Sequence, residues 1–488
     1  MPKFTFFNKY DILFIALLFF LINFVLKILF VSRNEIAMDE PFSIFYAQMD
    51  LPSIFKMLKT ENNPALHFIL LHFWIKIFGI GPFSVRFLSV LFSSLTASVI
   101  FLCGNKFFSK QTGIIAALIF TFSLFHIYFS HEARVYPLFV FLTALSLYYF
   151  LSLVNNPEKW KPYISLLVVN VLLIYAHYFG FFVLAAEFVS IFFVGNFRRI
   201  WKKMLFVFVL LVISYIPNII VFMQRLGVSV EHGTWVKKPE ITELYGNLNR
   251  FLNSRTVMIA MLLVVALYVV LLIRKHQLLP KLSEFLRSPS SRVLTIWFIF
   301  PYLGMFITSY WVPMFLDRYI IYISISFYLL VAVFIAKFTD NQIIRFVAAM
   351  FLLIVMLFNL SLSPDNNRRV DQVIQVVNDL KAKDPDSFVI ISPEYSYLEF
   401  TYHYNIGYFK DYKNTINLLN KENIFPLRDF SSFDETKLVA KKVIFIDCGT
   451  DFAFGKNPIL SELNSTHVLI KSYPIFEIYK IYWYQPKR

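Results

Sequence analysis

Long apolar runs separated by short polar gaps occupy the first three-quarters of the chain. A helix needs about 20 apolar residues to cross the hydrocarbon core of a bilayer. Eleven runs lie near that length: 11–31, 84–103, 112–130, 135–154, 161–178, 180–195, 203–223, 254–274, 291–311, 317–337 and 342–361. The pattern predicts a polytopic α-helical membrane protein with about eleven transmembrane helices.

The gaps richest in Lys and Arg all fall on one side if each run crosses once: 106–110, 159–161, 198–203, 274–292 and 337–345. By the positive-inside rule this side is the cytoplasm, together with the N-terminus. The apolar stretch 64–78 is shorter than a span, and counting it as one would invert every later loop. We therefore predict that it is an interfacial helix in the first external loop.

The pattern changes after residue 362. Helical and strand periods alternate there: helices at 370–381 and 397–404, buried strands at 387–392 and 443–447, and paired edge strands within 473–484. We predict a transmembrane domain at 1–362 and a small α/β domain at 363–488. The parity of the spans places the second domain outside the cytoplasm.

Composition excludes an ordinary set of soluble domains, because 58% of the residues are hydrophobic and only 16% are charged. The net charge of +15 suggests nucleic acid as a partner. However, the basic residues punctuate the gaps and form no compact basic domain, so membrane lipid is the expected partner. The two cysteines, Cys103 in an apolar run and Cys448 in the polar region, make a mutual disulfide improbable.

Asp39 and Glu40 follow the first apolar run on the predicted external side. One interpretation is that they cap a helix beginning at Pro41, since an acidic residue before Pro is a helix start signal. The other is that a carboxylate beside an apolar surface acts as a general base, because desolvation raises its proton affinity. The two roles are compatible.

Further titratable residues collect at the same predicted face. His131, Glu132, Arg134 and Tyr136 lie between two spans, and this arrangement could hold a phosphate oxygen. The alternative is a simple interfacial pair of Glu132 and Arg134.

Asp317, Arg318 and Tyr319 repeat the arrangement at the start of another span, where Arg318 could equally be snorkelling. His177 and Tyr178 lie in an external turn, where a histidine more often bonds to a helix end than it catalyses a reaction.

The long external loop 224–253 contains Trp235 and is a candidate lid or acceptor-facing segment, on position alone. No external cluster has the spacing of a metal site, so we predict no metal.

Several motifs in order resemble the GT-C superfamily of integral-membrane glycosyltransferases. They are the acidic pair 39–40, Asn-Asn-Pro-Ala-Leu-His-Phe at 62–68, the stretch 125–136 with Glu-Ala-Arg-Val-Tyr, Tyr-Ala-His-Tyr-Phe at 175–179, and Arg-Tyr at 318–319. The bacterial family 39-like branch, with the protein O-mannosyltransferases and the lipid A aminoarabinose transferase, is the most similar. The resemblance covers about residues 1–340.

This resemblance implies transfer of a sugar from a polyprenyl phosphate, such as undecaprenyl phosphate, to a lipid, glycan or protein outside the cytoplasmic membrane. It implies that Asp39 is the base and that Glu40 supports it. It also implies no cofactor and an inverting single displacement.

For the donor, the resemblance implies that Arg134 and Arg318, with Tyr136 and Tyr319, contact the phosphate and sugar, and that Glu132 orients Arg134. His131, His177 and Tyr178 are further candidates for donor binding.

One position departs from the family pattern. Related transferases often have His or Lys before a Pro-Pro pair, whereas this chain has Asn63 before a single Pro64. Asn63 supplies no charge to the phosphate, so Arg134 and Arg318 are expected to supply it.

Two other classes of protein remain open from the sequence. A transporter or lipid flippase usually shows internal repeats or ionisable residues near the membrane midplane, and a non-catalytic scaffold would use the acidic pair only as a cap. Loss of glycosyl transfer in Asp39→Asn would distinguish the enzyme from both.

Overall fold

A computed structural model describes residues 9–195, 197–362, 368–434, 438, 441–476 and 479–487. The chain divides into two compact units. The helical unit consists of Met1–Val31, Phe55–Leu70 and Arg86–Pro364, and the sheet unit consists of Ser32–Ile54, Leu71–Val85 and Asp365–Arg488. The predicted boundary at 363 lies outside the described residues, so the division into 1–362 and 363–488 stays a prediction.

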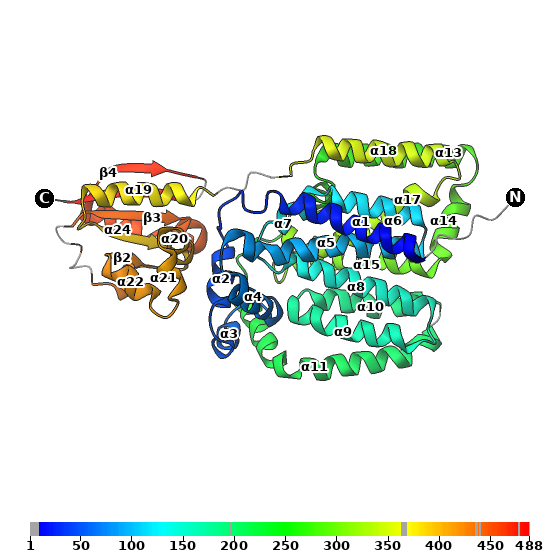
Figure 1. The fold of residues 1–488 in the computed structure, drawn as a ribbon, viewed down its shortest axis with the longest axis horizontal. Helices are drawn as coiled ribbons and strands as arrows, with labels where there is room; N and C mark the ends of the chain where they lie inside the picture. Colours follow the sequence, from blue (N-terminus) through cyan, green and yellow to red (C-terminus); the bar gives the residue numbers. More distant parts are fainter. Residues whose placement is uncertain are drawn as a thin grey trace. The chain divides into compact units, whose positions relative to one another are not determined.

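Every predicted apolar run contains helix in the structure (Figure 1). The helices are α1 (Lys9–Ile28), α5 (Pro82–Phe107), α6 (Lys110–Thr121), α7 (Leu124–Ser130), α8 (Tyr136–Asn155), α9 (Trp160–Ala176), α10 (Gly180–Phe193), α11 (Phe197–Glu231), α13 (Arg255–Arg274), α15 (Pro289–Thr308), α16 (Asp317–Ile320), η1 (Ile321–Ile323), α17 (Ser324–Lys337) and α18 (Gln342–Phe358). Shorter helices lie between them: α3 (Leu51–Leu58), α4 (Ala65–Phe78), α12 (Thr242–Phe251) and α14 (Leu278–Arg287).

Within the described residues, seven helices are long and apolar enough to cross a membrane, and the bent pair of α6 and α7 would make an eighth. The protein is therefore a polytopic helical membrane protein with seven to eight candidate spans, where the sequence predicted about eleven. The difference lies in α9, α10 and α18, which have only 17, 14 and 17 residues.

The predicted run 112–130 is broken, and one distant side chain caps the break. Helices α6 and α7 meet at 58°. The Asn253 amide donates to the Phe122 carbonyl over 2.8 Å, and its oxygen accepts from the Leu124 N–H over 2.7 Å. A hydropathy pattern carries no sign of a cap supplied from residue 253.

Burial separates central from peripheral helices in the helical unit. In the most apolar 18 residues of α8, and in those of the segment 317–337, 78% are buried. The corresponding shares are 17% in α11 and 28% in α13. The outer helices expose apolar side chains, as helices in contact with lipid do.

A carboxylate lies in the interior between α8, α9 and α10. Glu187 is fully buried. It accepts hydrogen bonds from the Ser146 hydroxyl over 2.6 Å and from the Asn170 amide over 2.8 Å. These bonds join three helices and satisfy both carboxylate oxygens.

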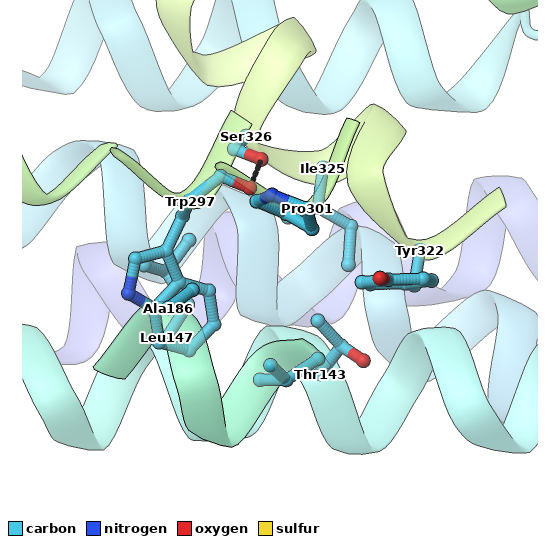
Figure 2. A pocket seen from close by; sticks show the side chains of 9 residues that line it. Thr143, Leu147, Ala186, Trp297, Pro301, Tyr322, Ile325 and Ser326 are labelled. Atoms are coloured by element: carbon cyan, nitrogen blue, oxygen red, sulfur yellow. Dashed lines mark hydrogen bonds between the residues drawn. The ribbon is translucent and has the colours of Figure 1, made fainter. Parts of the chain in front are cut away.

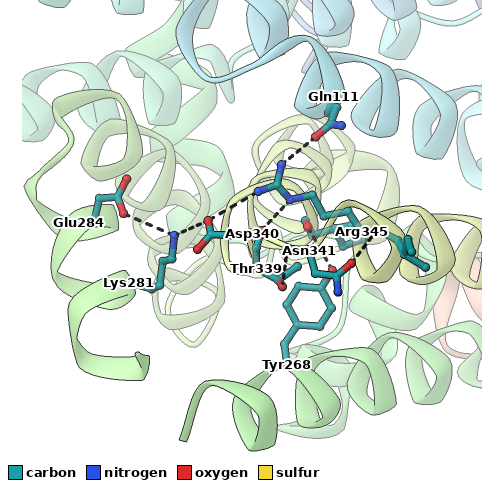
Figure 3. Close-up of polar contacts among 10 residues, drawn as sticks. Gln111, Tyr268, Lys281, Glu284, Thr339, Asp340, Asn341 and Arg345 are labelled. Carbon is teal, nitrogen blue, oxygen red and sulfur yellow. Dashed lines mark hydrogen bonds and ion pairs between the residues drawn. The ribbon is translucent and has the colours of Figure 1, made fainter. Parts of the chain in front are cut away.

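Charged side chains from predicted cytoplasmic gaps meet at one end of the helical unit (Figure 3). Lys281 Nζ lies 3.0 Å from an Asp340 carboxylate oxygen, and an Arg345 guanidinium nitrogen lies 3.8 Å from the same oxygen. Arg345 also donates to the Gln111 side chain over 3.2 Å. Gaps far apart in sequence therefore end on the same side of the bundle.

The sheet unit is built on a mixed sheet of five strands in the order β2-β1-β3-β5-β4. The strands are β1 (Phe388–Ser392), β2 (Ile424–Pro426), β3 (Val443–Cys448), β4 (His467–Pro474) and β5 (Tyr479–Pro486). Strand β1 is parallel to β2 and β3, whereas β5 is antiparallel to β3 and β4.

The helices of this unit are α2 (Glu40–Ala47), α19 (Val370–Lys383), α20 (Tyr397–Tyr404), α21 (Ile406–Lys410), α22 (Thr415–Lys421), α23 (Thr450–Phe454) and α24 (Pro458–Thr466). The predicted helices and buried strands of this region are confirmed, and β2 is an addition.

Candidate active site

Arg134 lies in the turn between α7 and α8. Its backbone N–H donates to the Glu132 carbonyl over 2.8 Å, and the Ser89 hydroxyl on α5 donates to the same carbonyl over 2.6 Å. The Arg134 guanidinium lies 5.9 Å from the centre of the Tyr136 ring at the start of α8. The turn is therefore tied to α5, and Arg134 is placed over an aromatic face.

His177 lies in the turn between α9 and α10, inside a group of aromatic rings. Its ring stacks on Phe139 at 4.8 Å and on Phe179 at 5.0 Å. It lies 6.2 Å from the Tyr136 ring and 6.0 Å from the Tyr319 ring. Its Nδ1 accepts a hydrogen bond from the Phe179 N–H over 3.2 Å, so the neutral ring carries its proton on Nε2.

Arg318 is placed by two further rings. Its guanidinium lies 5.7 Å from the Tyr319 ring and 4.9 Å from the Trp235 ring. Trp235 belongs to the loop between α11 and α12. The neighbouring Thr234 hydroxyl holds that loop by donating to the Pro313 carbonyl over 2.6 Å.

Ring contacts through Tyr136, His177 and Tyr319 therefore link the two arginines. We call the set the arginine–aromatic cluster: Arg134, Tyr136, His177, Arg318, Tyr319 and Trp235. Each guanidinium group is a planar N–H fork, a geometry that suits phosphate oxygens.

Two histidines near Arg134 are neutral. Burial, and then the positive charge of Arg134, lowers the pKa of both His67 and His177 to about 3. His67 lies in α4, and its Nε2 is buried without a hydrogen-bond partner among the described residues. The arginines therefore supply the positive charge here, and the histidines do not.

Three predicted donor-binding residues lie away from these ring contacts. His131 points toward α1, with Nε2 2.7 Å from the Lys27 carbonyl oxygen. The Tyr178 ring packs at 5.3 Å from Phe222 on α11. Asn63 is half-buried, and it is the neighbouring Asn62 that accepts a hydrogen bond from Arg225, over 2.9 Å.

Asp39 and Glu40 belong to the sheet unit, at the start of α2. Asp39 occupies the N-cap position, but its side chain makes no capping hydrogen bond. The interpretation of Asp39 as the N-cap residue is therefore confirmed for its position but not for a capping bond from its side chain. Asp39 is half-buried, and Glu40 is only 4% exposed.

Phe139, Phe179 and His67 were not among the predicted site residues. Phe139 follows Tyr136 by about one helical turn, so both lie on the same face of α8. That spacing was a usable signal. Nothing in the local sequence connects His67 with Arg134.

A small cavity in the helical unit does not belong to this site (Figure 2). Its lining includes Thr143 from α8, Ala186 from α10, Trp297 from α15 and Tyr322 from η1. The volume of about 10 Å³ can hold roughly one water molecule, so the cavity is too small for a sugar. Across the described ranges, no three His, Cys, Asp or Glu residues are grouped as metal ligands.

Residues 62–221 match a family model described as dolichyl-phosphate-mannose-protein mannosyltransferase. This stretch includes Asn63, Glu132, Arg134, Tyr136 and His177. None of the curated proteins matches the chain.

Solved structures match the fold along nearly the whole chain. Apo ArnT from Cupriavidus metallidurans gives a TM-score of 0.58 at 12% identity, with 97% of each chain covered. The same protein bound to undecaprenyl phosphate gives 0.56 at 12% identity, covering 96% of this chain and 97% of that one. The apo Archaeoglobus fulgidus oligosaccharyltransferase gives 0.55 at 12% identity, covering 99% of this chain and 75% of that one.

The arginine–aromatic cluster, the membrane helices and the family match agree with one another. The family match over residues 62–221 and the ArnT-like fold along nearly the whole chain identify a membrane glycosyltransferase that uses a lipid-phosphate-linked sugar.

Proposed function

We propose that this protein transfers a sugar from a polyprenyl phosphate to a lipid, glycan or protein acceptor on the outer face of the cytoplasmic membrane. The observation that carries the proposal is the arginine–aromatic cluster. It combines two cations with a bundle whose outer helices expose apolar side chains. A lipid-phosphate donor needs cations for its phosphate and an apolar surface for its lipid chain.

Arg134 and Arg318 are assigned to the donor phosphate. When the bond between the sugar C1 and the phosphate oxygen breaks, its electron pair moves to the phosphate, and the guanidinium groups stabilise the charge that develops. His177, neutral with its proton on Nε2, can donate one hydrogen bond. ArnT bound to undecaprenyl phosphate has the same fold, which supports a polyprenyl donor.

Asp39 is assigned as the general base. It takes the proton of the acceptor hydroxyl while the hydroxyl oxygen forms the new bond to C1 on the face opposite the phosphate. The configuration at C1 is then inverted.

The basic end of the bundle supports the proposed orientation. Lys281 and Arg345 lie at the end that the positive-inside rule assigns to the cytoplasm. With α9, α10 and α18 counted as crossings, eleven spans keep every basic gap on this side. The C-terminal region is then extracytoplasmic.

A deletion strain tests the function. We expect a polyprenyl-phosphate sugar to accumulate in it and a surface glycan to lose one sugar, both seen by mass spectrometry of lipid extracts and glycans. If neither changes, the proposed transfer is wrong.

Asp39→Asn tests the base in the same strain. We expect the wild-type gene to restore the glycan and Asp39→Asn to fail at an equal membrane level. Asp50→Asn is the matched control, because Asp50 is an exposed carboxylate in the same unit that caps α3 through the Ser53 N–H at 2.8 Å. Full restoration by Asp39→Asn would exclude Asp39 as the base.

A further inference from the structure

The loop that leads into Asp39 is bound by side chains from the C-terminal part of the sheet unit. The Ile36 carbonyl oxygen lies 2.7 Å from His403 Nε2, and the Met38 N–H donates to a Glu399 carboxylate oxygen over 2.7 Å. Both partners come from α20. Two of the three residues before Asp39 are therefore fixed through their backbone.

Further contacts continue on both sides of this loop. The Glu35 carboxylate accepts from the Val370 N–H over 2.6 Å. In α2, the Phe45 ring lies 5.3 Å from Phe409, whose carbonyl accepts from the Gln48 amide over 3.3 Å. Residues 35–48 are therefore attached along their length to α19, α20 and α21.

Met38 has a left-handed backbone, with φ of 57°. A residue with a Cβ is rarely stable in that region without help from its surroundings. Here the hydrogen bond from the Met38 N–H to Glu399 supplies that help. Because Asp39 comes next, the Met38 conformation decides the direction in which the chain enters α2.

Glu399 is placed to hold this conformation. Its side chain is 8% exposed. One oxygen accepts from Met38, and the other accepts from the Tyr479 hydroxyl over 2.6 Å. Burial raises the pKa of Glu399, while the hydrogen bonds from Tyr479 and Met38 lower it.

His403 makes a second bridge. Its Nδ1 lies 2.7 Å from an Asp371 oxygen, and its Nε2 lies 2.7 Å from the Ile36 carbonyl oxygen. Both partners are acceptors, so both are satisfied when the ring donates from both nitrogens. Besides Asp371, the carboxylates of Glu35 and Glu399 interact electrostatically with this ring.

Asp39 itself is close enough to Tyr395, just after β1, for an electrostatic interaction. Desolvation, and then the negative charges of neighbours that include Glu394 and Asp39, raise the pKa of Tyr395, which follows β1. Ligands of sheets with parallel strands bind at such strand ends.

We propose that Glu399, His403 and Tyr479 are positioning residues for glycosyl transfer. They fix the backbone of residues 36–38 and so direct the Asp39 carboxylate toward the acceptor hydroxyl. This inference rests on the proposed function, in which Asp39 is the base. It gives the C-terminal region a part in the reaction although its sequence carries no catalytic motif.

The test compares Glu399→Leu with Glu399→Gln in the purified full-length protein. The donor is the polyprenyl-phosphate-sugar fraction extracted from the deletion strain, and the acceptor is the membrane fraction of that strain. We expect Glu399→Leu to lower kcat by about 10- to 100-fold without changing KM for the donor, because a small misplacement of a catalytic group has effects of this size. Glu399→Gln should restore most activity, since its amide oxygen still accepts from Met38 and its NH₂ donates to the Tyr479 oxygen.

Glu422→Leu is the matched control. Glu422 also accepts from two tyrosine hydroxyls in the sheet unit, those of Tyr404 and Tyr408, but these partners do not belong to the loop before Asp39. We expect it to keep wild-type kcat. Equal losses in Glu399→Leu and Glu422→Leu would overturn the proposal, as would wild-type kcat in Glu399→Leu.

Two milder variants decide the question if Glu399→Leu does not fold. Tyr479→Phe removes the hydrogen bond to Glu399, and His403→Asn shortens the side chain that bridges Ile36 and Asp371. Both variants should lower kcat and speed hydrogen exchange in the peptide 35–41. Wild-type values in both would overturn the proposal. Asp39→Asn in the same assay separates the two ideas: if it is inactive while Tyr479→Phe and His403→Asn match wild type, only the positioning role fails.

Discussion

At the scale of single residues, each arginine of the arginine–aromatic cluster lies against aromatic rings that help to fix its position. A guanidinium over an aromatic face gains a cation–π attraction and keeps its planar N–H edge for an anion. Lysine keeps the charge but loses the planar fork. The shape of the cation therefore matters here as well as its sign.

Arg318→Lys should weaken the binding of undecaprenyl phosphate to the purified protein by about tenfold, which is about 1.4 kcal/mol. A titration in detergent measures it. Arg345→Lys is the control, because Arg345 bonds to Gln111 and Asp340 at the other end of the bundle. Equal weakening by both variants would contradict the phosphate assignment.

The sequence indicated some of this site and missed the rest for identifiable reasons. Arg134, His177 and Arg318 were candidates because ionisable residues at the ends of spans are uncommon. Tyr178 adjoins His177 in sequence yet packs on Phe222. Which residue of a turn faces a cluster depends on tertiary packing, and no local pattern encodes it.

At the scale of elements, buried polar bonds between helices add to apolar packing. Glu187, Asn170 and Ser146 interrupt three apolar runs, and each finds its partner on another helix. Apolar runs predicted where the helices lie. They could not predict the break at residues 122–123, which Asn253 caps, or the three-residue strand β2.

Asn170→Leu should lower the thermal stability of the protein in detergent, because it leaves the buried Glu187 with one partner fewer. The expected cost is about 1–3 kcal/mol. Glu187→Gln keeps acceptor and donor groups at the same place and should cost less. On α8, Asn155→Leu is the control, since Asn155 is exposed and water can replace its bond to Ser290. A larger loss in Asn155→Leu than in Asn170→Leu would contradict the argument.

At the scale of the whole molecule, the family match decides between the enzyme and the transporter. The buried Glu187 does not mark a transport pathway, because it is fully enclosed and bonded on both oxygens.

The composition of the sheet unit could not be predicted from the sequence. The sheet unit includes Ser32–Ile54, which meets the C-terminal region through contacts such as Met38 with Glu399, 361 residues apart.

Removal of residues 363–488 should therefore do more than delete a separate module. We expect the shortened protein to insert in the membrane and to lose glycosyl transfer, with new proteolytic cleavage between residues 32 and 54. Limited proteolysis followed by mass spectrometry locates the cuts. Protection of this segment equal to that in the full chain would show that it holds its structure alone.

The separation between Met38 and Glu399 along the chain also determines how long Met38 waits for its partner during synthesis. At about 5–20 residues per second, a ribosome needs roughly 20–70 s to make the 361 residues between them. During that time the segment before Asp39 has none of its partners from α19, α20 or β5. On the proposed roles of Asp39 and Glu399, a nascent chain that has already inserted its helices is inactive until α20 and β5 are complete, so unfinished copies in the membrane consume no donor.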